Sequence, residues 1–192
     1  MDKDNELMLD VGQANEIKLA ARRAGATNAD LKLLSEGDTF AKILPVLRGF
    51  AEVTSIKPII DLDVDPMIPT DWTVKEHIKG GQFEFDPKRV ALYLDKAQQG
   101  GGTIVGKKLR QKLKSKGVYN ANLLDFLLAH PELIPKKWKG KFIFFWGTIY
   151  RDSSGYLCVR CLRWDGDRWG WDYYWLVNDF SGVSPAVVSA SN

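Results

Sequence analysis

The 192-residue chain has few cysteines and no long apolar run. Its two cysteines are too few to hold a fold together by disulfides, which is typical of a reducing compartment. The longest apolar run, Phe142 to Ile149, is interrupted by Gly147 and Thr148 and falls far short of the roughly 18 residues that a membrane span needs. The N-terminal region lacks the apolar segment of a secretory signal. We therefore expect a soluble, cytoplasmic protein without a membrane partner.

The composition is that of a folded protein with an uneven charge distribution. Hydrophobic residues make up 45% of the chain and charged residues 27%, which is enough apolar material for a buried core. The net charge is only +3, but residues 107–141 hold 10 basic and 2 acidic side chains. The segments 1–51, 52–106 and 142–192 are each slightly acidic. Such a basic patch attracts phosphate groups even when the whole protein is nearly neutral.

The first fifty residues have the pattern of short helices. Apolar side chains recur at helical spacing over residues 5–24, and a glycine follows. Two further helices are expected over residues 28–34 and 38–48, each beginning at a side chain that can cap a helix. Pro45 should bend or shorten the third helix. We predict that residues 1–51 form a small helical unit.

The rest of the chain mixes strands and helices. Strands are expected over residues 72–78, 82–85, 141–150, 156–164 and 168–177, helices over 103–117 and 120–129, and either type over 86–94. Turn-forming residues separate the last three strands, which favours a three-stranded antiparallel meander rich in aromatics. The small, polar residues 181–192 suggest a flexible tail. The sequence thus predicts an α+β fold, with an α+β domain over residues 52–180.

Cationic side chains cover most of the expected helix 103–117. Leu109 and Leu113 form only a narrow apolar seam, and such a cationic surface gains free energy by releasing counterions from nucleic acid. A second basic cluster surrounds Trp138, whose ring could stack among cations. The alternative to a binding function is a solvated helix surface whose lysines only aid solubility. We predict a non-enzymatic protein that binds nucleic acid through Lys107, Lys108, Arg110, Lys112, Lys114 and Lys116, with secondary contacts from Lys136, Lys137 and Trp138.

Aromatic residues alternate along the expected last strand. Trp169, Trp171, Tyr173 and Trp175 should project from one face, either as a platform for a ligand or, as we expect, as core with a partly exposed edge. A second hypothesis is a protein-interaction or regulatory module that binds itself or another protein. It would use exposed aromatics of this sheet or the acidic strip Asp61 to Asp65.

Catalytic and metal-binding signals are weak. A small metal-dependent hydrolase using Asp61, Asp63 and His77 is the weakest alternative, because no spacing requires it. Cys158 and Cys161 form a C-x-x-C, but residues three apart on a strand point to opposite faces, so their sulfurs should not converge on zinc. We predict no catalytic residue, no metal site and no cofactor.

Three stretches are similar to an uncharacterised family of bacterial hypothetical proteins. They are Asn-Ala-Asn-Leu-Leu-Asp at 120–125, His-Pro-Glu-Leu-Ile-Pro at 130–135 and Phe-Phe-Trp-Gly-Thr-Ile-Tyr-Arg at 144–151. With the Trp-rich strand that follows, the resemblance covers about residues 58–178. It implies a bacterial protein with a folded unit there, and no activity, cofactor or site residue.

Overall fold

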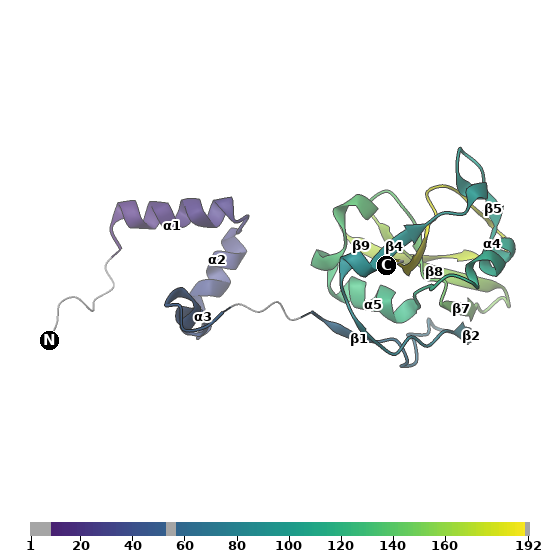
Figure 1. The fold of residues 1–192 in the computed structure, drawn as a ribbon, viewed down its shortest axis with the longest axis horizontal. Coiled ribbons are helices and arrows are strands. Elements are labelled where there is room, and N and C mark those ends of the chain that lie inside the picture. Colours follow the sequence, from purple (N-terminus) through teal and green to yellow (C-terminus); the bar gives the residue numbers. More distant parts are fainter. Residues whose placement is uncertain (1–8, 53–56, 191–192) are drawn as a thin grey trace. The chain divides into compact units, whose positions relative to one another are not determined.

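The computed structural model describes residues 9–52 and 57–190. The chain divides into two compact units, residues 1–55 and 56–192, both drawn in Figure 1. None of the helices within the described residues combines the length and apolar character needed to cross a membrane.

The first unit consists of short helices whose ends are set by local hydrogen bonds. They are α1 (Val11–Arg23), α2 (Asn28–Ser35) and α3 (Thr39–Leu47), close to the predicted ranges, although residues 5–8 lie outside the described part. Asp10 accepts a hydrogen bond from the Gln13 N–H, and the Gln13 side chain accepts one from the Asp10 N–H. The same reciprocal arrangement caps α2. Pro45 lies inside α3 without ending it, and none of these helices buries a side chain.

The second unit contains the remaining elements. Its helices are α4 (Gly106–Leu113) and α5 (Ala121–Ala129), with 3-10 turns η2 (Pro87–Arg89), η3 (Lys96–Gln98), η4 (Pro131–Leu133) and η5 (Lys136–Trp138). Its strands are β1 (Ile59–Asp61), β2 (Thr73–His77), β3 (Gln82–Glu84), β4 (Val90–Tyr93), β5 (Ile104–Val105), β6 (Ile143–Phe144), β7 (Thr148–Arg151), β8 (Leu157–Trp164), β9 (Trp169–Trp175), β10 (Asp179–Phe180) and β11 (Ala186–Ser189). This mixture confirms the predicted α+β fold.

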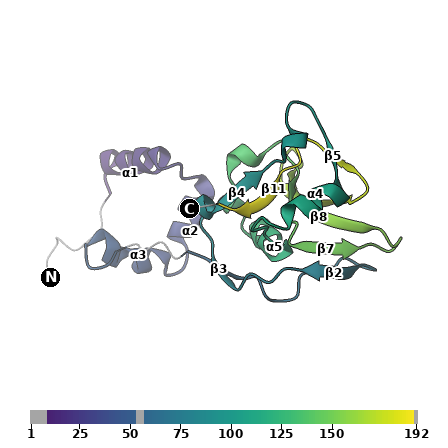
Figure 2. The ribbon, with the colours of Figure 1, turned by 45° about the vertical axis from the view of Figure 1, so that its right-hand side comes forward.

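Seven strands form one sheet. Its order is β2-β7-β8-β6-β11-β4, and β9 pairs with β8 along the opposite side of β8. The consecutive strands β7, β8 and β9 are antiparallel, as the predicted meander requires. Figure 2 shows β2, β7 and β8 lying in this order. Two small antiparallel pairs, β1 with β3 and β5 with β10, lie outside this sheet.

Both faces of the sheet are covered. Side chains of β8 alternate between two cores, because successive residues of a strand point to opposite faces. Leu162 packs in a core with Leu124 of α5, whereas Val159 packs in a core with Leu109 and Leu113 of α4. The two helices therefore cover opposite faces of β8.

The predicted strand over residues 141–150 is wrong as a single element. It is divided into β6 and β7 by a turn at Trp146 and Gly147, while the Phe145 N–H still donates to the Arg160 carbonyl of β8. A Cβ atom at Gly147 would lie 2.8 Å from the backbone nitrogen of Asn120. The strand is interrupted here, where the chain passes closely over the start of α5.

The predicted flexible tail is also wrong within the described residues. Ala186–Ser189 form β11, which runs parallel to β6 and antiparallel to β4 inside the sheet. Gln98 holds the chain just before this strand, because its amide donates to the carbonyls of Ser181 and Ser184. The small side chains fit an interior strand between β4 and β6. The composition of the segment, which is typical of a tail, therefore led to the wrong prediction.

The middle of the chain contains the predicted strands but pairs them differently. The strands expected over 72–78 and 82–85 are β2 and β3, yet β2 pairs with β7 and β3 pairs with β1. Both structures considered for residues 86–94 occur, because η2 leads into β4. The basic helix expected over 103–117 is shortened to α4, since residues 104–105 pair with β10 as β5.

The close approach of Gly147 to Asn120 generates a stability prediction. Gly147→Ala should lower the free energy of unfolding by about 1–3 kcal/mol, because the new methyl group overlaps the Asn120 backbone. Urea denaturation followed by circular dichroism measures this change. Gly170→Ala is the matched control, since a Cβ there meets nothing within 4 Å, and should change stability by less than about 0.5 kcal/mol. Equal losses in the two variants would contradict this packing.

Candidate functional site

The orientation of α4 is fixed by a narrow apolar seam. Leu109 and Leu113 are 0% and 2% exposed and lie four residues apart on one face. At the start of the helix, Gly106 packs so closely on Phe180 and Leu176 that a Cβ atom would lie 2.6 Å from the Phe180 ring. These contacts set the rotation of α4 about its axis and therefore the direction of each cationic side chain.

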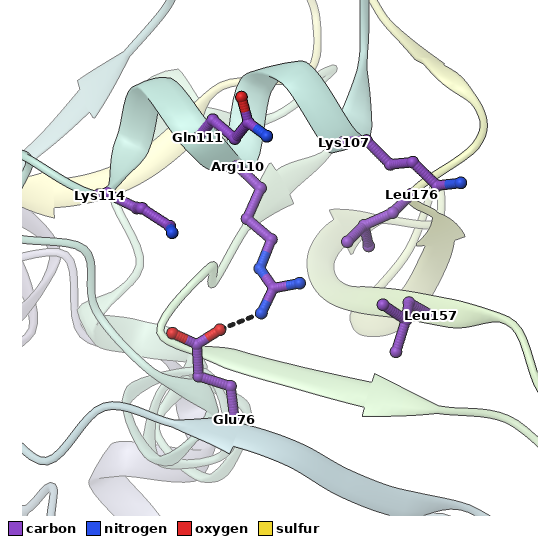
Figure 3. A pocket seen from close by; sticks show the side chains of 7 residues that line it. All are labelled: Glu76, Lys107, Arg110, Gln111, Lys114, Leu157 and Leu176. Atoms are coloured by element: carbon purple, nitrogen blue, oxygen red, sulfur yellow. Dashed lines mark hydrogen bonds and ion pairs between the residues drawn. The ribbon is translucent and has the colours of Figure 1, made fainter.

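One side of α4 faces a pocket of about 380 Å³. Lys107, Arg110 and Lys114 are spaced by three and four residues and all line it. In Figure 3, Arg110 points towards Glu76, whereas Lys107 extends past Leu176 at the other end of the pocket. Glu76 of β2 forms an ion pair with Arg110 at this pocket. The pocket is completed by Gln111, Leu157 and Leu176. Among the described residues, no carboxylate pairs with Lys107 or Lys114.

Two further hollows adjoin this pocket. A small one shares Glu76, Arg110 and Lys114 with it, and a third, of about 390 Å³, shares Lys114 with both. No carboxylate of the described residues lines the third hollow, which also contains cations from three other positions. We call the resulting set of cations the basic groove: Lys79, Arg89, Lys107, Arg110, Lys114 and Lys116.

Two cations of the groove also rest on aromatic rings. The Lys116 ammonium lies 5.1 Å from the centre of the Tyr93 ring, and the Arg89 guanidinium lies 5.1 Å from that of Phe83. Such contacts hold a long side chain in place while leaving its charge available. The groove therefore has ordered cations at this end as well as on α4.

Lys112 has a structural contact instead of facing the groove. Its ammonium donates to the carboxylate of Asp95 at 2.7 Å, and Asp95 is only 6% exposed. The hydrogen bond from Lys112 and a second from the Ala97 N–H lower the pKa of Asp95. Lys108, four residues earlier on the same side of α4, is exposed and lines none of these pockets. The six predicted cations are thus divided between two sides of the helix and the turn that follows it.

The predicted second basic cluster is not brought to the groove. Trp138 is 3% exposed and packs in the core beside α5, so the predicted stacking role for its ring is wrong. The 3-10 turn η5 points the ring inward and leaves Lys136 and Lys137 exposed. Lys137 lines a separate hollow of about 600 Å³ that shares no residue with the basic groove.

The aromatic row on β9 is partly core and partly surface. Trp72 contacts Trp171 and Tyr173 edge-on, with ring centres 6.5 and 4.8 Å apart. The Arg160 guanidinium lies 4.5 Å from the centre of the Trp171 ring. Because neighbouring rings meet at steep angles, they do not form a flat stacking platform. Trp171 and Trp175 nevertheless remain 39% and 38% exposed.

The residues of the metal-dependent alternative are engaged in hydrogen bonds. The ring nitrogens of His77 lie 2.9 Å from the Thr148 hydroxyl and 3.2 Å from the Leu62 carbonyl. Asp61 accepts from the Asp63 N–H within the same loop. No cluster of three or more metal-binding side chains occurs in the described part of the chain. These groups fasten the loop after β1 to the sheet.

The cysteines behave as the strand pattern predicts. Cys158 and Cys161 are both fully buried and belong to different cores on opposite faces of β8. Burial raises the pKa of the Cys158 thiol to about 12 and that of Cys161 higher still. Both thiols are therefore protonated at neutral pH and do not converge on a metal ion.

Sequence reasoning missed part of the basic groove. Lys79, Arg89 and Glu76 lie in an acidic segment that is separate in sequence from the basic one. Only the pairing of β2 with β7 brings Glu76 to α4, and no local signal in the sequence indicates that contact. Comparison of the chain with protein families, curated proteins and solved structures finds no match.

The contact between Lys112 and Asp95 generates a pH-dependent stability prediction. Lys112→Ala should lower the free energy of unfolding at pH 7 by about 1–2 kcal/mol, because it removes a charged hydrogen bond from a buried carboxylate. The pKa of Asp95 is lowered from 3.8, so its ionised form stabilises the fold above that value. The difference in free energy of unfolding between Lys112→Ala and the unmodified protein should therefore shrink as the pH falls below about 4. Urea unfolding across this range measures it, and a difference independent of pH would contradict the ion pair.

Proposed function

We propose that the protein is a non-enzymatic nucleic-acid-binding protein that holds the backbone of a single strand in the basic groove. One observation carries the proposal: three adjoining hollows are lined by six cations and by one carboxylate, Glu76. This charge is concentrated in a protein of net charge +3, so it is a local property of the surface.

The arrangement of the cations favours a ligand with several phosphates. Lys107 lines the first pocket, Lys114 lines all three, and Lys79 and Arg89 line the third. A single phosphate would contact only part of this series. A nucleic-acid backbone repeats its charge along the strand and can meet successive cations, releasing counterions at each contact.

The hollows that the cations line favour a single strand over a duplex. Helices that read duplex DNA protrude into the major groove. Here Arg110 points from α4 towards Glu76 of the sheet, and Lys107 and Lys114 line the same pocket on either side of it (Figure 3). A single strand is thin enough to enter such a recess. Leu157, which is half-buried, and the buried Leu176 line the first pocket and give it an apolar wall for a sugar or base.

Removing two groove cations should weaken binding and its salt dependence together. In Lys107→Ala/Lys114→Ala, the loss of two phosphate contacts should reduce the slope of log affinity against log salt by about 1.4. Fluorescence anisotropy with a labelled mixed-sequence single-stranded oligonucleotide, titrated at several NaCl concentrations, measures both quantities. The control Lys136→Ala/Lys137→Ala removes the same charge outside the groove and should leave the slope unchanged. Equal effects of the two double variants would contradict binding in the groove, and so would affinity indifferent to salt.

Removing the internal carboxylate should have the opposite effect. Glu76 is paired with Arg110 and competes with a ligand phosphate for it. Glu76→Gln should therefore tighten binding of the same oligonucleotide and steepen its salt slope by about 0.7. Glu132→Gln is the control, because Glu132 is exposed and lines none of the three hollows. Weaker binding by Glu76→Gln would show that Arg110 does not take up a ligand phosphate.

A further inference from the structure

We infer that the free edge of β9 pairs antiparallel with β9 of a second copy of this chain. β9 is hydrogen-bonded to β8 along one side only. Within the described residues, no strand covers the other side from Trp169 to Trp175. Two peptide groups of this stretch have local partners, since the Tyr173 N–H donates to the Asp172 carboxylate and the Trp175 carbonyl accepts from the Asn178 N–H, and pairing would exchange these contacts for hydrogen bonds between strands. An uncovered edge of this kind readily accepts another strand.

The edge at β9 lacks the features that normally prevent strand addition. Its register with β8 runs without interruption over seven residue pairs, and the strand contains no proline and no lysine. The opposite edge strand, β2, is different. It is interrupted between Val74 and Glu76, and it carries Lys75 at the irregularity. Bulges and edge lysines are common protections against pairing, so β2 is protected and β9 is not.

The sequence of β9 is complementary to itself. A two-fold axis at Asp172, the central residue of the strand, would place Trp171 opposite Tyr173 of the second copy and Trp169 opposite its Trp175. These positions lie at odd distances from the centre, so all four pairs would form on one face. Aromatic pairs directly across an antiparallel ladder stabilise it. This self-complementarity identifies a second copy as the occupant of the edge.

Charge at the centre of the pairing is partly compensated within each chain, by an arginine that Asp172 shares with Asp165. Asp172 is the only acidic or basic residue in β9, and the two-fold axis would place it opposite its counterpart. The Arg163 Nε of β8 lies 3.3 Å from the Asp172 carboxylate. Two arginines would therefore accompany the two carboxylates, which reduces their repulsion. Pairing would also extend the partly exposed aromatic surface of Trp171 and Trp175 across both copies.

A cysteine at the centre of the strand tests both the pairing and its register. Residues directly opposite in an antiparallel pair have Cα atoms about 4.5–5.5 Å apart, within the range of a disulfide. Asp172→Cys should therefore form a disulfide-linked dimer under mild oxidation, seen on a non-reducing gel. Cys158 and Cys161 are buried and should not contribute. Asp167→Cys, in the exposed turn before β9, is the control and should not become cross-linked, so it should run as a single chain on the same gel.

Light scattering on the unmodified chain provides the second measurement. We expect a species of twice the 21.7 kDa chain mass, and we expect Trp171→Lys to convert it to monomer with its circular dichroism spectrum retained. Ile59→Lys removes an apolar side chain that is 67% exposed on β1 and should leave the dimer intact.

Three results would overturn the inference. The first is a monomer at all concentrations of the unmodified chain, which would leave the edge open or covered by something else. The second is equal cross-linking of Asp172→Cys and Asp167→Cys. The third is a dimer that persists in a folded Trp171→Lys variant, because it would then form through another surface.

Discussion

The alternation of side chains along β8 is the constraint on which the second unit depends. Each of its hydrophobic cores includes a residue of this strand: Leu162 in one, Val159 and Cys161 in another, and Cys158 in the third. Because neighbouring residues point to opposite faces, α5 and α4 must pack on different sides. The basic groove exists because α4 packs over one face with Arg110 and Lys114 beside Glu76 of the edge strand β2.

The one fully buried charged residue of β8, Arg160, explains how α5 is held. Arg160 is 0% exposed, and its guanidinium makes two hydrogen bonds to Asp125 of α5, at 2.7 and 3.2 Å. A buried charge requires a partner, so Asp125 ties the helix to one position on the strand. The Trp171 ring covers the same guanidinium. Part of the aromatic row therefore serves the fold, while its outer surface stays available.

The sequence predicted the elements whose signals are local. Asn120 caps α5, as expected of a polar residue before an apolar run. The opposite orientations of Cys158 and Cys161 follow from strand geometry alone. The position of β11 was not predictable in this way. Its small residues resemble a tail, and only their pairing with β4 and β6 makes them an interior strand.

The candidate site shows the same difference between what local sequence signals predict and what tertiary contacts determine. The excess of lysine and arginine in residues 107–141 correctly marks α4 as the most cationic element. Whether each cation is available depends on tertiary neighbours: Asp95 engages Lys112, and Glu76 engages Arg110. Trp138 turns into the core because η5 follows α5 closely. The charge distribution in the sequence thus predicted which helix is cationic. The tertiary contacts determine which of its cations line the groove.

The two surfaces proposed here are compatible because of the strand order. In the sequence of strands β2-β7-β8-β9, Glu76, which pairs with Arg110, belongs to the first strand and the self-pairing edge to the last, while Leu176, directly after β9, lines the far end of the first pocket. Two chains joined through β9 would therefore keep the β2 side of both grooves open. A strand of nucleic acid long enough to reach both grooves would bind the second at a raised effective concentration. Pairing at one edge of the sheet would then increase affinity at the other without adding a contact to the ligand.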